Sequence, residues 1–271
     1  MHAVSYTAQW TAAARALESE REDPLVVDPL ARDLAAPQGF ELIDRYGGGG
    51  LREFVAIRTW FLDDLIGRLD GVAQVVLIAA GMDTRAFRLT WPAGVEVFEV
   101  DHAPLIAEKQ RRLDALGAVP TVTRHAVAAD LTTEWLPDLV AAGFAPDRPT
   151  LWVTEGLTFF LTEEQVAGLL AVLRGASAPG SGLAVDIMGK ALLRNPFSKP
   201  FLDALAADGT PWLFGTDEPE EFLAAHGWKV VELREPGEPG VGQRRWPYEV
   251  HPRSRRGASR HWLIRAEVVR G

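Results

Sequence analysis

The chain has 271 residues, a formal net charge of −9 and no cysteine, and its composition is 47% hydrophobic and 24% charged. These values are typical of one globular domain with a substantial core, and they exclude disulfides and thiolate metal sites. The acidic balance argues against nucleic-acid binding, and the six histidines show no paired ligand spacing, so we expect no metal site. No apolar run has the length of a membrane helix and no signal-peptide pattern is present, so we expect a cytoplasmic protein with no membrane partner.

The first 70 residues are predicted to form a helical cap ahead of the first strand. Apolar residues recur at near-helical spacing over 5–20, and two prolines then interrupt the chain. After four glycines at 47–50, a long amphipathic pattern runs over 54–69 and carries Arg58. We expect this helical region to cover the domain that follows it.

Short apolar strands and helical patterns alternate after residue 70. Strands are expected near Val75, Val95, Val122, Leu151, Leu183 and Lys229, and over 259–269. This alternation predicts an α/β fold with a mostly parallel sheet, helices on both faces, and ligands at the carboxyl ends of the strands. Four predicted strand ends each present one candidate residue: Gly81, Asp101, Asp130 and Glu155. We expect these four residues to share one crevice.

The first strand and the turn after it are the most informative part of the sequence. The apolar run that begins at Val75 ends at Gly81, and the next strand ends at Asp101, twenty positions later. A glycine turn after one strand and an acid after the next are typical of a site for an adenosine-containing cofactor, in which the acid accepts hydrogen bonds from ribose hydroxyls. The turn lacks the three spaced glycines of a pyrophosphate cradle, which disfavours a nicotinamide dehydrogenase. Taken alone, the pattern also fits an ordinary α/β crossover.

Several ordered blocks of the sequence resemble the leucine carboxyl methyltransferase family, in a style closest to bacterial tetracenomycin-type polyketide O-methyltransferases. The blocks are Phe54–Thr59, Ala80–Arg85, Glu99–Asp101, Asp130–Leu131 and Glu155–Leu157, with a weaker match over 222–228. The resemblance implies a Rossmann-like class I methyltransferase with a seven-stranded sheet, whose last strand pairs antiparallel beside the sixth. It also implies S-adenosyl-L-methionine as the cofactor.

The resemblance assigns cofactor contacts residue by residue. Arg58 is similar to the family's arginine for the cofactor carboxylate, and its planar fork suits two parallel charge-assisted hydrogen bonds. Asp101 corresponds to the ribose-binding acid, while the Asp130 carboxylate and the Leu131 amide are expected at the adenine edge. The contacts around the methionine amino group and its neighbouring turn are expected from Gly81, Glu155 and Gly156.

Two positions depart from the family pattern. Ala79 replaces the first glycine of the turn, which we expect to be tolerated if this residue keeps ordinary strand angles. Phe160 replaces a tyrosine, which removes a hydroxyl group near the acceptor. In addition, Arg15 resembles a second basic position that the family places near the cofactor carboxylate.

The methyl acceptor is expected to bind beside an aromatic insertion. We divide a single methyltransferase domain over 1–271 into the cap (1–70), a cofactor-binding core (71–189), a lid-like helical insertion (190–216), and a C-terminal helix with strands (217–271). The candidate acceptor contacts are Phe159, Phe160, Phe201, Trp212 and Arg245. Ordinary helix packing also explains aromatic residues in such a segment, so the packing interpretation stays open beside the binding one.

The chemistry of the acceptor is predicted from charge and from the lack of an evident base. Residues 229–271 carry ten Lys/Arg against five Asp/Glu, which makes Arg244, Arg245 and Arg260 candidate anchors for an anion, or parts of a solvated hairpin. No histidine is placed as a convincing general base, so we assign no catalytic residue and favour a carboxylate or acidic phenol of a small aromatic, polyketide-like molecule. Methylation of a protein C-terminal carboxylate, and cofactor binding without catalysis, stay open as alternatives. The sequence leaves the oligomeric state undetermined.

Overall fold

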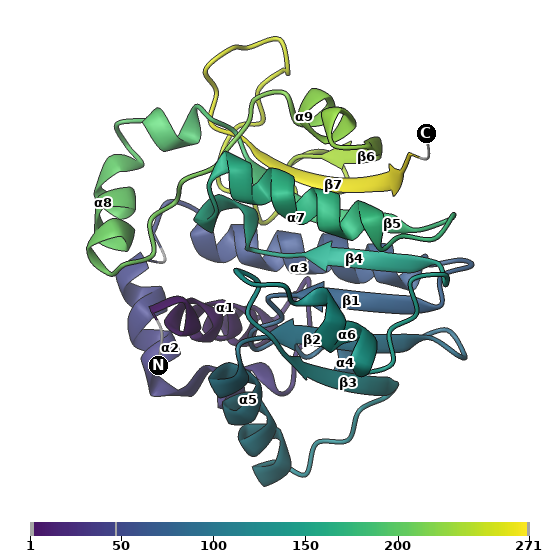
Figure 1. Ribbon diagram of the computed structural model, residues 1–271. Helices are drawn as coiled ribbons and strands as arrows, with labels where there is room; N and C mark the ends of the chain where they lie inside the picture. Colours follow the sequence, from purple (N-terminus) through teal and green to yellow (C-terminus); the bar gives the residue numbers. More distant parts are fainter. Residues whose placement is uncertain (1–2, 47, 270–271) are drawn as a thin grey trace.

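A twisted sheet forms the centre of the protein. The computed structural model describes residues 3–46 and 48–269, with side chains from residue 7 onward. Within this part of the chain, seven strands pair in the order β3-β2-β1-β4-β5-β7-β6 (Figure 1). The strands are β1 (Gln74–Ile78), β2 (Glu96–Asp101), β3 (Thr123–Ala128), β4 (Thr150–Thr154), β5 (Gly182–Met188), β6 (Trp228–Arg234) and β7 (His261–Val268). The predicted α/β class with a mostly parallel seven-stranded sheet is therefore confirmed.

The strand order brings three turns together at one edge of the sheet. Strands β1 to β5 pair in parallel, whereas β7 lies antiparallel between β5 and β6. Because β1 lies between β2 and β4, the direction in which the chain adds strands reverses there. Ile78 pairs with Val100, and Leu77 pairs with Val153, so the turns after β1, β2 and β4 leave the sheet side by side. Crevices at such a reversal are the usual ligand sites of open α/β sheets.

Helices cover both faces of the sheet. They are α1 (Ala3–Ser19), α2 (Ala31–Tyr46), α3 (Leu51–Gly67), α4 (Arg85–Arg88), α5 (Ala103–Ala115), α6 (Leu136–Ala141), α7 (Glu163–Gly175), α8 (Lys199–Ala207) and α9 (Pro219–Ala225), with 3₁₀ turns η1 (Thr158–Phe160) and η2 (Leu192–Arg194). Along β1, Val76 and Ile78 join the core under α6, α7 and α9, while Val75 and Leu77 join the core under α3 and α4. Burial on both faces is why this strand is a continuous apolar run. Figure 1 shows α7 in front of the sheet and α3 behind it. In the described residues, no helix combines the length and apolar character needed to cross a membrane.

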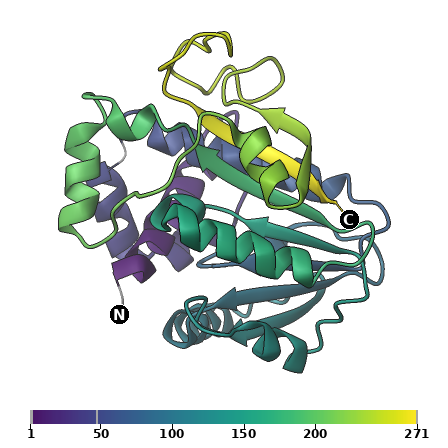
Figure 2. The same ribbon diagram turned by 45° about the horizontal axis from the view of Figure 1, so that its top comes forward.

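The N-terminal helices form a layer beyond the carboxyl ends of the parallel strands. Helices α1 and α2 pack against each other and share a hydrophobic cluster with part of α8 (Figures 1 and 2). Gly39 permits this close contact, because a Cβ atom there would lie 2.4 Å from the carbonyl oxygen of Gln9. Helix α2 is kinked at Ala36, which has φ 54 directly before Pro37. The cap therefore covers the edge of the sheet at which the ligand turns emerge.

The expected insertion, residues 190–216, contains η2, α8 and an extended return to the sheet. Its aromatic residues differ in burial: Phe197 is 94% exposed, whereas Phe214 is buried in the core beside α9. Trp212 contacts η1, as described below. Closure of this segment over a bound cofactor stays a prediction, as does the four-part division of the chain.

Candidate functional site

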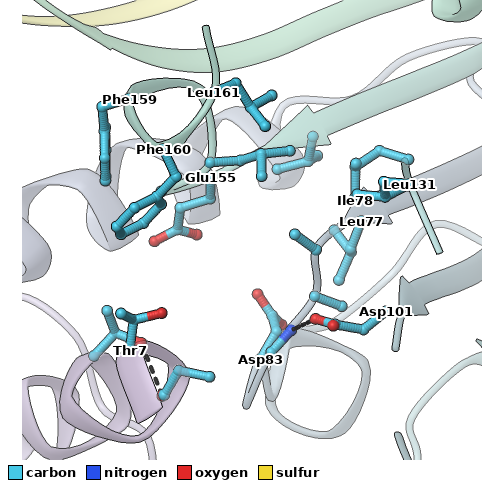
Figure 3. Close-up of a pocket in the computed structure, with 18 of the residues that line it drawn as sticks. Thr7, Leu77, Ile78, Asp83, Asp101, Leu131, Glu155, Phe159, Phe160 and Leu161 are labelled. Atoms are coloured by element: carbon cyan, nitrogen blue, oxygen red, sulfur yellow. Dashed lines mark hydrogen bonds between the residues drawn. The ribbon is translucent and has the colours of Figure 1, made fainter. Parts of the chain in front are cut away.

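A cavity of about 480 Å³ lies at the carboxyl edge of the sheet, between the strand ends and the helical cap. All seven residues predicted to contact the cofactor line it: Arg58, Gly81, Asp101, Asp130, Leu131, Glu155 and Gly156. Figure 3 shows the Glu155 carboxylate facing this space beside Phe160, with Thr7 of α1 and Asp83 on the opposite side. The volume lies within the range typical of small-molecule sites. The strand ends expected to share one crevice therefore do so.

Asp101 ends β2 with its carboxylate fixed by two backbone groups. The Gly81 N–H donates to Oδ2 at 2.7 Å, the bond drawn to Asp101 in Figure 3. The His102 N–H donates to Oδ1, also at 2.7 Å. Burial raises the pKa of Asp101 above its ordinary value, although these two hydrogen bonds oppose the shift. Each oxygen still has a lone pair that can accept from a ligand hydroxyl, so the side chain is held ready to bind a diol.

The turn after β1 is more strained than the sequence led us to expect. Ala79 has φ 55, so the condition of ordinary strand angles is not met, and its backbone lies in the left-handed region that favours glycine. Gly81 has φ 48, and a Cβ atom there would approach the Cβ of Ala8 to 3.0 Å. Helix α1 therefore packs directly on the turn, and Gly81 allows both this contact and the backbone angle.

Arg58 projects from α3 into the cavity wall and is only 3% exposed. Its Nε donates to Glu155 Oε1 at 2.9 Å, and its Nη1 donates to Asp186 Oδ2 at 3.0 Å. Among the described residues, none accepts a hydrogen bond from Nη2. A Cβ atom on Gly156 would lie 3.2 Å from both terminal nitrogens, and Gly156 has φ +69. The glycine thus leaves room for the guanidinium group beside the turn after β4.

Arg85 joins the turns after β1 and β4. Its Nη1 donates to Glu155 Oε2 at 2.6 Å and also to Asp83, while its Nε donates to Asp63 Oδ1 at 2.7 Å. Burial opposes ionisation of Asp83, but the neighbouring cations, Arg85 first and Lys109 next, lower its pKa to about 2. Burial likewise acts to raise the pKa of Glu155, but Arg85 and Arg58 together hold it below its ordinary value. Both carboxylates are therefore ionised at neutral pH.

A second buried ion pair ties the cap to the turn. Arg15 of α1 donates from Nε to Asp28 Oδ2 at 2.9 Å and from Nη2 to the Met82 carbonyl oxygen at 2.5 Å. The Thr84 hydroxyl donates to the same Asp28 oxygen at 2.6 Å. Arg15 also lines the cavity, as its resemblance to a second basic position implied. Sequence reasoning did not single out Asp28, and the only local signal for it is the segment Val27-Asp28-Pro29 before a helix.

The other end of the cavity follows β3. Asp130 begins a turn in which its Oδ1 accepts from the Thr132 N–H at 2.9 Å and from the Thr132 hydroxyl at 2.6 Å. Leu131 and Trp135 line the cavity beside it, and Trp135 is buried in the core under α6. This end combines a carboxylate, a backbone segment and an apolar face, which are the groups needed to hold a heteroaromatic base.

Aromatic side chains line the end of the cavity near the insertion. The ring of Trp212 lies 4.6 Å from Phe159, and Phe159 lies 4.8 Å from Phe160. The main chain joins the two segments, because the Leu213 N–H donates to the Phe159 carbonyl oxygen at 2.6 Å. Phe201 is absent from the described cavity wall, but it packs edge-on against Trp212 at 4.9 Å and supports it from behind.

The basic residues of the C-terminal segment lie elsewhere. Arg245 has its Nη2 3.0 Å from Glu18 Oε1, and Arg260 donates to both carboxylate oxygens of Glu235 at 2.6 and 2.9 Å. Among the residues described, Arg244, Arg245 and Arg260 do not contribute to the cavity wall. The physical reason is that buried guanidinium groups take the nearest carboxylate as partner. The acceptor-binding role expected of Arg245 therefore has no contact to support it.

Comparison with known proteins places the chain in a family. Residues 8–174 match the family described as leucine carboxyl methyltransferase, and this span includes β1 to β4 and all seven predicted cofactor contacts. The chain belongs to this family. A protein of Parafrankia sp. assigned as an S-adenosyl-L-methionine-dependent methyltransferase is 41% identical over 244 residues, 85% of this chain and 78% of the relative. A Mycobacterium avium protein of the same assignment is 36% identical over 268 residues, 84% of each chain.

Solved structures agree with this assignment at the level of the fold. A protein from Thermobifida fusca assigned as a methyltransferase matches with a TM-score of 0.64 and 18% identity, over 97% of this chain and 94% of that one. Magnesium protoporphyrin IX methyltransferase from Synechocystis, with bound S-adenosylhomocysteine, matches with a TM-score of 0.50 and 13% identity, over 88% and 98%. As a member of the leucine carboxyl methyltransferase family, the protein is a methyltransferase with the predicted Rossmann-like class I fold, and its cofactor is S-adenosyl-L-methionine.

The cavity of this leucine carboxyl methyltransferase family member fits that cofactor. A carboxylate can pair with the Nη2 of Arg58, a buried cation whose other nitrogens are already engaged. A ribose diol can donate to the two fixed oxygens of Asp101, and the end near Asp130 and Trp135 suits adenine. Charged, diol and aromatic parts of one ligand therefore each have a complementary group in the wall.

Proposed function

We propose that the protein methylates an acidic oxygen, a carboxylate or acidic phenol, on a small aromatic, polyketide-like molecule. The observation that supports this most is the aromatic end of the cavity, where Phe159 and Phe160 come soon after the Glu155–Gly156 turn and Trp212 of the insertion packs against Phe159. Such a wall suits a flat apolar molecule of limited size. A cytoplasmic location and a role in polyketide biosynthesis stay predictions that belong to the same proposal.

The proposed orientation of the cofactor follows the order of groups along the cavity. Arg58 holds the carboxylate through Nη2, Asp101 accepts from the ribose hydroxyls, and Asp130 with the Leu131 amide holds the adenine edge. Glu155, which accepts from Arg58 Nε and also lines the cavity, faces the methionine amino group. In this orientation the methionine end lies toward the aromatic wall, where the acceptor binds.

The chain aligns the reactants and excludes water. Bound S-adenosyl-L-methionine supplies a methyl group that its sulfonium makes electrophilic. Glu155 is unsuited to be a general base, because both of its oxygens accept from arginines and its pKa is lowered. His102, in the described cavity wall, lies beside Asp101 at the ribose end. An acceptor that binds already ionised needs no base, so alignment and exclusion of water are the main contributions.

The test is a panel of acceptors that differ in one property each. Initial rates with labelled S-adenosyl-L-methionine are measured for 2-naphthoate, 1-hydroxyanthraquinone, 2-naphthylmethanol and a peptide that ends in a free leucine carboxylate. We expect turnover with the naphthoate or the hydroxyanthraquinone and none with the neutral alcohol of similar shape. Methylation of the peptide alone would contradict the small-molecule proposal. If neither this panel nor an extract of the source organism yields S-adenosylhomocysteine, the result would favour cofactor binding without catalysis.

The alternative acceptor, a protein C-terminal carboxylate, has one observation in its favour. The family that contains this chain is named for leucine carboxyl methylation. However, a peptide tail needs an open path to the methyl group, and the insertion here is bonded to η1 through Leu213 and Phe159 at the aromatic end. The small-molecule acceptor is therefore the better-supported proposal, and the peptide arm of the panel distinguishes the two.

A further inference from the structure

Asp186 is a buried carboxylate in β5 that contacts three parts of the site at once. It is 2% exposed, and its Oδ2 accepts from Arg58 Nη1 at 3.0 Å. Its Oδ1 accepts from the Gly156 N–H at 2.7 Å, and its carbonyl oxygen accepts from the Thr158 hydroxyl at 2.8 Å. One residue thus fixes a side chain of α3, the turn after β4 and the start of η1.

We propose that Asp186 is a positioning residue for the cofactor carboxylate, acting through Arg58. The inference rests on the proposed role of Arg58 in binding that carboxylate. Asp186 does not line the described cavity wall, so its effect on the ligand passes through the guanidinium group and the glycine turn. Neither the sequence motifs nor the family match assigns it a role.

The geometry of Arg58 explains why a second carboxylate is needed. Glu155 alone contacts Nε, at 2.9 Å, and a single hydrogen bond leaves the planar group able to swing about that contact. Asp186 binds Nη1 from the other side, so the two carboxylates together fix the plane and leave Nη2 as the donor not used by the described residues. The direction of Nη2 is therefore set by Asp186.

Asp186 also fixes the Gly156 turn, which lies beside the guanidinium group of Arg58. The Gly156 N–H and Arg58 Nη1 bond to the two different oxygens of Asp186, so the turn and the side chain are held at a fixed separation. A Cβ atom on Gly156 would lie only 3.2 Å from Arg58 Nη1, which shows how close the two groups are. Burial raises the pKa of Asp186, and the charge of Arg58 and the hydrogen bond from Gly156 oppose that shift.

The test is the Asp186→Asn variant with two ligands that differ in the methionine part. The amide oxygen can still accept from Gly156, but the amide nitrogen faces Arg58 Nη1, donor against donor. We expect calorimetry to show S-adenosylhomocysteine binding weakened about tenfold or more, while 5′-methylthioadenosine, which lacks the amino-acid part, changes by less than about twofold. A similar loss for both ligands, or for neither, would overturn the proposal.

Control variants separate this role from stability and from the proposed function. Glu235→Gln removes another buried carboxylate, paired with Arg260 at 2.6 Å, and should lower the melting temperature while leaving both affinities unchanged. Arg58→Lys should show the same ligand selectivity as Asp186→Asn, and equal losses there would reject the role of Arg58 itself. If Asp186→Asn does not fold, Asp186→Glu keeps the charge and must still weaken S-adenosylhomocysteine selectively, since the longer side chain displaces the guanidinium group.

Discussion

Replacement of Asp101 by asparagine tests the ribose site with the smallest change of shape. In the wild-type protein, the Gly81 and His102 N–H groups each donate to one carboxylate oxygen at 2.7 Å. Asparagine has only one acceptor oxygen, so its amide nitrogen must face one of these two N–H donors. The ligand also loses one of the two oxygens that could accept from its hydroxyl groups. Asp101→Asn therefore perturbs both the fixed turn and the proposed contact with the ribose.

The two effects have separate magnitudes. A hydrogen bond to a charged group contributes about 1.5–3 kcal/mol, so the affinity for S-adenosylhomocysteine should fall by roughly tenfold to a hundredfold. One buried N–H without an acceptor costs about 1–3 kcal/mol, which lowers the melting temperature of a chain of this size by several degrees. The affinity loss should therefore be measurable under conditions in which the variant is still folded.

The assay is calorimetric titration below both melting temperatures, with S-adenosylhomocysteine and its 2′-deoxy analogue. Loss of the 2′-hydroxyl should weaken binding strongly in the wild-type protein and only slightly in Asp101→Asn, because the variant has already lost the charge that the hydroxyl contacts. Glu235→Gln, a buried carboxylate paired with Arg260 away from the described cavity wall, serves as the control and should bind both ligands as the wild type does. Wild-type affinity in Asp101→Asn, or the same 2′-deoxy penalty in both proteins, would refute the ribose assignment.

Three further changes test other parts of the account. Arg58→Lys keeps the positive charge but loses the planar guanidinium group. S-adenosylhomocysteine should therefore bind about tenfold more weakly, while the affinity for 5′-methylthioadenosine is unaffected. If calorimetry shows equal losses for both ligands, Arg58 only supports the fold. Ala79→Gly removes the steric strain of an alanine with positive φ, so it should raise the urea midpoint by an amount equivalent to about 1 kcal/mol. Ala80→Gly, the control, should lower the urea midpoint. A lower midpoint in both variants would contradict the strain argument. His261 has its pKa lowered from 6.5 to about 3, by burial first and then by the charge of Arg58. Between pH 6.5 and about 3, His261 binds a proton in the unfolded chain but not in the folded chain, so wild-type stability falls as the pH falls from 7 to 4. In urea titrations, His261→Phe should reduce this dependence of stability on pH. Identical pH dependence in the wild type and the variant would contradict this assignment.

The fold and the line of polar strand ends could be predicted because both depend on local pattern. Apolar runs of strand length mark the sheet, and the residue at which each run stops marks the ligand edge, as at Gly81, Asp101 and Glu155. Parallel strands bring their carboxyl ends together whatever the intervening helices contain. The cavity therefore contains the residues that the sequence had already placed at strand ends.

The buried ion pairs could not be predicted in the same way, because their partners are far apart in the chain. Arg58 and Asp186 are separated by 128 positions, and nothing in the apolar run around Asp186 indicates which cation it contacts. The left-handed angle of Ala79 was missed for a related reason, since an alanine gives no sign of positive φ. For Arg245 a charge count is a weak guide, because it ignores the carboxylate of Glu18 that pairs with this arginine in the fold.

The most direct test of the account is a crystal structure of the protein with S-adenosylhomocysteine. We predict that the ligand carboxylate accepts a hydrogen bond from Arg58 Nη2 and that the ribose hydroxyls donate to Asp101. The sulfur atom should then face the aromatic wall formed by Phe160 and Trp212. A ligand carboxylate bound away from Arg58, or a sulfur atom turned away from that wall, would contradict the proposed site and its acceptor.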